Sequence, residues 1–126
     1  MKIYIAGRYS LLNELAKEGK KFSDAGFTLT SSWLNNAEDG MSFKDIAVVD
    51  LQDVDDADTL VVYTENYGTL VSGGGRHVET GYALGKGKKV IVVGPLENVF
   101  HWHPDVVSFP RTEYAIRYLQ RETSHV

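Results

Sequence analysis

Short apolar segments of strand length alternate with longer segments of helical periodicity along this chain, and this alternation is its most constraining feature. The strand-like segments cover 2–6, 27–30, 58–63 and 88–93. The helical segments cover 10–25, 43–56, 76–86 and 112–122. Continuous apolar strands joined by helices are typical of a parallel sheet that is covered on both faces. The sequence therefore predicts an α/β fold, a single-domain Rossmann-like or flavodoxin-like parallel sheet flanked by helices.

Length and composition limit the class of protein. The 126 residues are expected to form one domain over 1–126, long enough for a core without metal or disulfide support. The formal net charge of −4 disfavours a dedicated nucleic-acid binder, and the absence of cysteine excludes disulfides and a thiol nucleophile. No signal peptide is visible, and no apolar run approaches the ~20 residues that span a bilayer. We expect a cytoplasmic protein that binds neither nucleic acid nor membrane.

The expected ligand site lies at the carboxyl ends of the strands, where sheets of this kind bind their ligands. Gly7 and the loops 64–75 and 94–104 follow predicted strands and belong to this edge. The glycines at 73–75 allow backbone or ligand to approach closely. Ser42 and Asp45 are spaced as a capping pair and predict the start of the helix over 43–56.

Two carboxylates stand out on the predicted helices. Asp50 lies within an apolar stripe between Ile46 and Val54, and Glu79 lies in the first turn of the helix after the glycines. A carboxylate on a buried face needs a partner or a proton, whereas the macrodipole keeps one at a helix N-terminus ionised. Each carboxylate also has a purely structural alternative. Asp50 would hydrogen-bond a neighbouring loop from the edge of its helix, and Glu79 would compensate the dipole at the start of its helix. If both reach one pocket, they are typical of glycosidic chemistry, one as nucleophile and the other as acid/base.

Three motifs follow one another in order: KIYIAG at 2–7, DLQDVDDADTLVVY at 50–63 and GGGRHVETGYALGKGKKVIVV at 73–93. Together they resemble the nucleoside 2-deoxyribosyltransferase family, which includes nucleoside 5′-monophosphate N-glycosidases, over residues 2–103. The resemblance implies that Glu79 is the nucleophile that forms a covalent glycosyl-enzyme and that Asp50 assists the leaving base by proton transfer. It implies that Tyr4 hydrogen-bonds the nucleophile. It also implies a homo-oligomer in which Asn98 binds the sugar's 5′ end in a neighbouring subunit's site.

The segment before Glu79 departs from the family's pattern. Transferases of free nucleosides carry a carboxylate that binds the 5′-hydroxyl at the position of Gly73. Ser72 resembles the serine that binds the phosphate in the monophosphate glycosidases. A glycine-rich loop and a helix N-terminus are suited to a phosphate. The predicted substrate-binding residues on this side are Gly7, Arg8, Ser10, Ser72, Gly73, Gly75 and Arg76. The alternative for the two arginines is that they are solvated surface charges.

Aromatic and histidine residues give weaker signals. Trp33, near the end of the second predicted strand, is the preferred candidate for stacking on a base, with core packing as the equal alternative. His101 and His103 lack a nearby cysteine or carboxylate to complete a metal site, so packing or lid roles are favoured for them. We expect neither a metal nor a cofactor.

The sequence thus predicts an enzyme that cleaves the N-glycosidic bond of a nucleoside or nucleoside 5′-monophosphate, a small-molecule partner. The alternative is a binding module that senses or sequesters a nucleotide without cleaving it. Hydrolysis and base transfer share the glycosyl-enzyme, and the sequence favours neither. The identity of the base and of the sugar is open as well.

Overall fold

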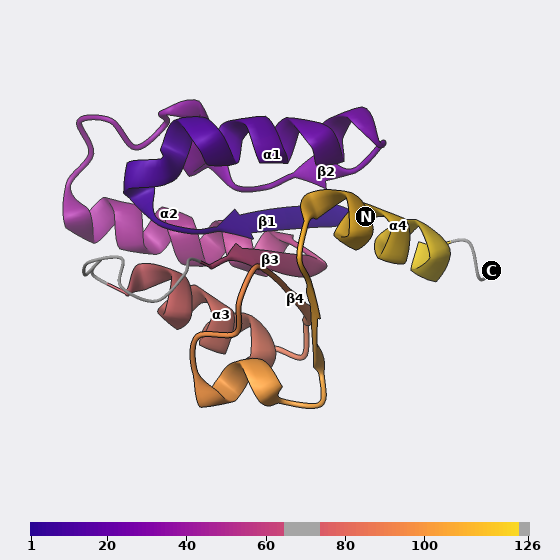
Figure 1. Cartoon of the computed structure of the whole chain (residues 1–126). Helices are drawn as coiled ribbons and strands as arrows, with labels where there is room; N and C mark the ends of the chain where they lie inside the picture. The colour runs from indigo at the N-terminus through magenta and orange to yellow at the C-terminus, as the bar shows by residue number, and fades with distance from the viewer. Residues whose placement is uncertain (65–73, 124–126) are drawn as a thin grey trace.

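The computed structural model describes residues 1–64 and 74–123, which are built on a parallel sheet (Figure 1). Its strands are β1 (Lys2–Ala6), β2 (Thr28–Leu29), β3 (Thr59–Tyr63), β4 (Lys89–Val93) and β5 (Val106–Phe109). The strand order is β2-β1-β3-β4-β5, and every neighbouring pair is parallel. This order is the flavodoxin-like one, so the predicted fold class is confirmed.

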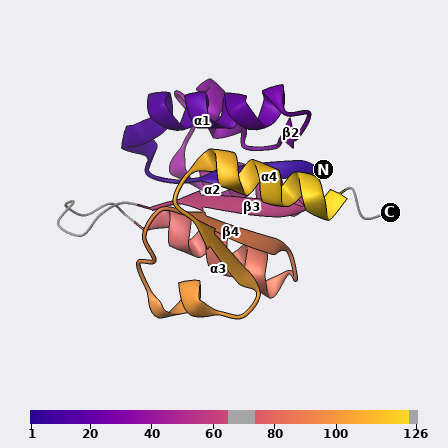
Figure 2. The same ribbon diagram turned by 45° about the vertical axis from the view of Figure 1, so that its right-hand side comes forward.

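Helices cover the sheet on both faces. They are α1 (Leu12–Asp24), α2 (Phe43–Asp56), α3 (Gly75–Gly85) and α4 (Thr112–Thr123), with 3₁₀ turns η1 (Tyr9–Leu11), η2 (Ser32–Asn35) and η3 (Val99–Trp102). α1 packs beside α4, and α2 packs beside α3 on the opposite face (Figures 1 and 2). The predicted cap of α2 is confirmed, since the Ser42 hydroxyl accepts the Asp45 N–H at 3.1 Å. In the described part of the chain, no helix is long and apolar enough to cross a membrane.

The core lies between these layers. The central strands β1, β3 and β4 are buried on both faces, which explains why their sequences are continuous apolar runs rather than alternating ones. Leu15 and Phe22 from α1 and Leu119 from α4 are buried against them. The amphipathic spacing on these two helices supplies the apolar face that the sheet requires.

Two segments differ from the prediction. The strand β5 was not predicted, because VVSF is short, lies at the sheet edge and is bounded by Pro104 and Pro110, which read as loop. The segment 34–41, predicted as a polar loop, begins within η2 and buries Leu34 and Glu38. Burial in this segment depends on its packing near α1 and α2, which the polar local sequence does not reveal.

The sheet has a topological switch point between β1 and β3. These strands are neighbours, yet the chain runs outward from β1 to β2 before it crosses back to β3. Connections therefore leave the two strands in opposite directions at their carboxyl ends, which opens a crevice there.

Candidate active site

A cavity of about 690 Å³ opens at this switch point. Its volume lies within the range of roughly 300–1,000 Å³ that is usual for small-molecule sites. Its wall is formed by β1 and the residues that follow it, by η2 and the segment before α2, and by side chains of α2 and of the N-terminal half of α3. The lining residues that the sequence predicted are Tyr4, Gly7, Arg8, Ser10, Trp33, Asp50, Gly75, Arg76 and Glu79. Segments far apart in the sequence thus bring the predicted carboxylates to one cavity.

Tyr4 and Glu79 form a hydrogen-bonded pair in the cavity wall. The Tyr4 hydroxyl donates to Glu79 Oε2 at 2.5 Å. Tyr4 is fully buried in β1, and burial together with the Glu79 charge raises the pKa of its hydroxyl well above the ordinary value. The hydroxyl therefore stays protonated and acts as a donor that fixes one carboxylate oxygen of Glu79. The contact predicted between these residues is present.

The position of Glu79 on its helix differs from the prediction. α3 begins at Gly75 and has no acidic residue in its first turn, so Glu79 lies in the second turn. The macrodipole acts chiefly within the first turn. Burial raises the pKa of Glu79 to about 7, against the Tyr4 hydrogen bond, which lowers it, while the Asp50 and Asp53 charges raise it further. Burial thus opposes the ionised form of Glu79, which the predicted position at the helix end would have favoured.

Asp50 faces the cavity from α2 beside a second acid that the sequence analysis missed, Glu38. Glu38 and Asp50 line the same cavity wall and interact there, and Glu38 Oε2 and Asp50 Oδ1 are both buried without a hydrogen-bond partner among the described residues. Desolvation raises the pKa of Asp50, whereas the contact with Glu38 lowers it. Desolvation and the contact with Asp50 raise the pKa of Glu38 to about 8, so the proton of the pair resides first on Glu38. The sequence predicted that Asp50, on a buried face, needs a partner or a proton. Its partner in the structure is another acid, Glu38. A glutamate in an otherwise polar loop gave no local signal of this role.

The segment that carries Glu38 is tied to the sheet and to α2. The Trp33 indole N–H donates to the Ile5 carbonyl at 2.8 Å, and the Ser32 hydroxyl donates to Asp53 at 2.5 Å. Trp33 is buried, so core packing holds its ring, while its edge lines the cavity. Tyr9 is exposed and its ring lies 6.2 Å from that of Trp33, so Tyr9 presents a freer aromatic face to a ligand.

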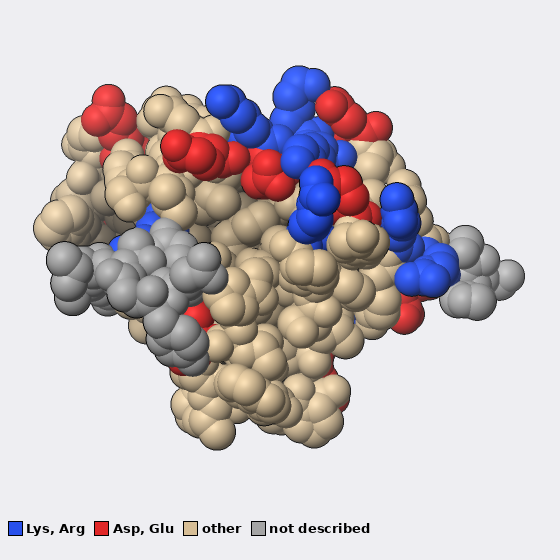
Figure 3. Space-filling view, viewed as in Figure 1, with Lys and Arg blue, Asp and Glu red and all other residues tan. Residues whose placement is uncertain are grey.

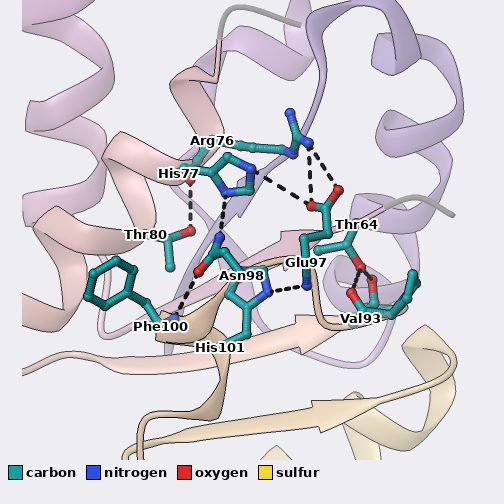
Figure 4. Close-up of polar contacts among 10 residues, drawn as sticks. Thr64, Arg76, His77, Thr80, Val93, Glu97, Asn98, Phe100 and His101 are labelled. Carbon is teal, nitrogen blue, oxygen red and sulfur yellow. Dashed lines mark hydrogen bonds and ion pairs between the residues drawn. The ribbon is translucent and has the colours of Figure 1, made fainter. Parts of the chain in front are cut away.

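Arg76 lies at the start of α3 and is buried rather than solvated. Its guanidinium forms an ion pair with Glu97 at 3.2 Å (Figure 4). His101 is buried beneath this pair, and its Nδ1 accepts the Glu97 backbone N–H at 3.0 Å. Burial lowers the pKa of His101 and of His77, so both rings are held neutral. The surface-charge alternative for Arg76 is wrong, since the side chain is part of a buried network that borders the cavity.

Asn98 does not line the cavity of its own chain. Its Oδ1 accepts the Phe100 N–H at 2.9 Å and caps η3, and its amide nitrogen lies 3.4 Å from His77 Nδ1 (Figure 4). Ser72 and Gly73 fall outside the described residues. Among residues 1–64 and 74–123, no group of three or more histidines and carboxylates is arranged to hold a metal ion.

The arrangement of these groups defines a type of site. A buried glutamate is oriented by a tyrosine, a pair of acids shares the same cavity, and a helix N-terminus with two arginines borders it. Glycosidases in general use an ionised carboxylate as nucleophile and a second carboxyl group with a raised pKa as acid. The class defined by fold and site is a flavodoxin-like α/β protein with an acidic pocket at the switch point.

Solved structures share this fold. A 2-deoxyribosyltransferase from the psychrotolerant bacterium Bacillus psychrosaccharolyticus aligns with TM-score 0.72 and 23% identity, over 94% of this chain and 92% of that one. The Clostridium botulinum CMP N-glycosidase BcmB aligns with TM-score 0.63 and 16% identity, over 96% and 99%. A conserved protein from Enterococcus faecalis V583 aligns with TM-score 0.71 and 18% identity, over 97% and 98%.

No family model matches the sequence, and no curated protein is significantly similar to it. The chain has the fold of a 2-deoxyribosyltransferase and of a nucleotide N-glycosidase along nearly its whole length. The fold implied by the sequence resemblance is therefore confirmed.

Proposed function

We propose that this protein, as one domain over 1–126, cleaves the N-glycosidic bond of a nucleoside or nucleoside 5′-monophosphate through a covalent glycosyl-Glu79 intermediate. The observation that carries the proposal is the Tyr4–Glu79 hydrogen bond at the wall of a cavity that also holds Asp50. A buried carboxylate oriented by a tyrosine in a cavity, with a raised pKa, is typical of catalytic sites and favours catalysis over binding alone. The shared fold of a deoxyribosyltransferase and a CMP N-glycosidase supports this chemistry.

The first half-reaction forms the intermediate. Ionised Glu79 attacks C1′ as the bond from C1′ to the base nitrogen breaks through an oxocarbenium-like transition state. Asp50 gives a proton to the departing base, which leaves as the neutral molecule. Tyr4 holds one oxygen of Glu79 through its hydroxyl, so the other oxygen is available for attack.

The second half-reaction releases the sugar. Water, or the nitrogen of a second base, attacks C1′ of the glycosyl-enzyme, and the Glu79 carboxylate leaves. Asp50, now ionised, takes the proton of the attacking group and returns to its starting state. Hydrolysis and base transfer differ only in the group that attacks.

The 5′ side of the substrate lies, in this proposal, against the residues after β1 and the start of α3. Gly75, whose backbone N–H is at the first turn of α3, and the side chains of Arg8 and Ser10 line this part of the cavity. Free N–H groups at a helix N-terminus bind phosphate oxygens well. Arg76 is already paired with Glu97, so it contributes a partly neutralised charge. These features favour a 5′-monophosphate over a free nucleoside.

A second copy of the chain completes the site in this proposal. Val78 on α3 and Val99, Phe100 and Trp102 on η3 are between 64% and 73% exposed. The contact of His77 with Asn98 joins α3 to η3 beside these side chains. In Figure 3, lysines and arginines gather over α1 and α4, whereas the part formed by segment 95–109 is mostly uncharged. An apolar surface of this kind next to Asn98 is suited to self-association.

The activity is tested with a panel of nucleosides and 5′-monophosphates, each incubated with and without a second free base. Released base is followed by chromatography, and exchanged base identifies transfer. Glu79→Gln is expected to stay folded and lose activity by at least about a thousandfold, because the nucleophile is removed. The control Glu14→Gln makes the same chemical change on an exposed residue of α1. Binding without release of base in the wild type would establish the binding-module alternative instead.

The shared site is tested by mixing two inactive variants. Asn98→Asp keeps the acceptor that caps η3 but replaces the amide, and Glu79→Gln removes the nucleophile. If Asn98 acts in a neighbouring subunit, mixed oligomers contain one intact site and regain activity. Absence of recovery under conditions of subunit exchange would contradict the shared site. Phe100→Asp is expected to dissociate the oligomer in sedimentation analysis, while Tyr114→Asp on α4 leaves it intact.

A further inference from the structure

Glu38 is the buried acid of the cavity for which the reaction described above has no role. Its side chain reaches the cavity from the segment between η2 and α2, and the residue is only 6% exposed. Its Oε2 and the Oδ1 of Asp50 are both buried, and neither accepts a hydrogen bond from a donor in the described part of the chain. A buried acidic pair without such donors needs another means of compensating its charge.

A shared proton is one such means. Two ionised carboxylates have only acceptors, so they cannot hydrogen-bond each other, whereas one ionised and one protonated carboxyl group form a short charge-assisted bond. Repulsion between two neighbouring carboxylates also opposes the ionisation of both groups near neutral pH. Two interacting acids of one cavity wall, each with a buried oxygen that no described donor reaches, are therefore compensated when the pair holds one proton.

The surroundings of the pair favour retention of this proton. Glu79 on α3 and Asp53 on α2 add negative charge, and the Tyr4 hydroxyl on β1 is engaged with Glu79. The cations at the same cavity are Arg8 and Arg76, and Arg76 is neutralised by Glu97. The pKa of Glu38 is accordingly raised to about 8, with burial as the largest cause.

We propose that Glu38 is a positioning residue that shares one proton with Asp50 and so keeps Asp50 supplied with the proton that the leaving base requires. The inference rests on the proposed N-glycosidase function. An isolated aspartate ionises near 4 and is almost fully deprotonated at neutral pH. A pair that holds one proton in common supplies it to the base at neutral pH through Asp50.

The proton balance closes over the catalytic cycle. When the C1′–base bond breaks, the pair's proton moves to a nitrogen of the base and both carboxyl groups are left ionised. Their mutual repulsion makes the pair a strong base for the second step. The attacking water then gives its proton to the pair and its hydroxyl to C1′, and Glu79 leaves as a carboxylate. No other reactant is needed.

The first test is the pH dependence of kcat/KM for the wild type, Glu38→Gln and Glu38→Ala. Glutamine donates N–H to Asp50 and stabilises its ionised form, so the alkaline limb is expected to move to lower pH by about one unit or more. At a pH of about 8 this shift lowers the rate roughly tenfold, with a smaller loss at about pH 6. The control Glu14→Gln is expected to keep the wild-type profile. A fall of equal size at every pH would show a merely structural role and overturn the proposal.

The second test needs no turnover. The carboxyl carbon of Glu38 is followed by ¹³C NMR during a pH titration of the folded wild type and of Asp50→Asn. The wild-type signal is expected to titrate at about 8, and removal of Asp50 is expected to bring it toward the ordinary value of 4.5 by more than about one pKa unit. If Glu38 titrates in Asp50→Asn as it does in the wild type, the shared proton is refuted. Cleavage of substrates by the wild type would in that case still support the proposed function. A coupled titration in a protein that cleaves no substrate refutes both the catalytic use of the proton and the proposed function.

Discussion

Replacement of Glu79 by glutamine is expected to stabilise the folded protein above neutral pH while it abolishes activity. The pKa of Glu79 is raised from 4.5 to about 7 in the folded state, chiefly by burial. The contribution of this group to stability is thus fully present below pH 4.5, where both states are protonated, and is lost as the pH rises through about 7. A pKa difference of about 2.5 corresponds to roughly 3 kcal/mol of unfolding free energy.

Glutamine removes this pH dependence with little change in shape. Its amide oxygen still accepts the Tyr4 hydroxyl, but its amide nitrogen is also desolvated, which offsets part of the gain. We therefore expect Glu79→Gln to be more stable than the wild type by about 2 kcal/mol at pH of about 8.5, and nearly equal at about pH 5. For a chain of this length the gain corresponds to a rise in Tm of about 6–10 °C.

The measurement is urea denaturation followed by tryptophan fluorescence at several pH values between those limits. Glu14→Gln serves as the control, because its exposed carboxylate is removed without any change in the cavity. The reasoning would be refuted if the difference between Glu79→Gln and the wild type were the same at both pH values. A variant that is less stable than the wild type at the higher pH would refute it as well.

Three further predictions concern the same site. The pH–rate profile is expected to be a narrow bell, rising through about 7 as Glu79 ionises and falling through about 8 as Glu38 and its partner acid lose their proton, and a flat profile would contradict this. Tyr4→Phe removes the hydrogen bond that lowers the pKa of Glu79, so the acid limb of kcat/KM should move to higher pH and the rate should fall by about tenfold or more. Gly7→Ala introduces a Cβ that clashes with Leu15 Cδ1 and should lower the unfolding free energy by about 1–3 kcal/mol. A double-mutant cycle with Leu15→Ala should show positive coupling, and additive effects would exclude the clash.

Much of the fold could be predicted because its determinants are local. Three of the five strands, β1, β3 and β4, are continuous apolar runs, and the α2 cap requires only Ser42 and Asp45. β5 was missed because an edge strand of four residues between prolines is stabilised by pairing with β4, which is remote in sequence. Its local composition resembles a loop, so only the formed sheet identifies it as a strand.

The sequence by itself predicted four of the five strands, the position of the cavity at the strand ends, and three of the side chains that line it, Tyr4, Asp50 and Glu79. It did not determine their protonation states or their neighbours. Glu38 pairs with Asp50 across two elements of the fold, and Arg76 is paired with Glu97 rather than solvated. The pKa of a carboxyl group depends on the water it loses and on the charges that approach it, and both are set by segments distant in sequence. Tertiary structure therefore decided that the pKa values of Glu38 and Glu79 in this cavity are raised toward neutral pH.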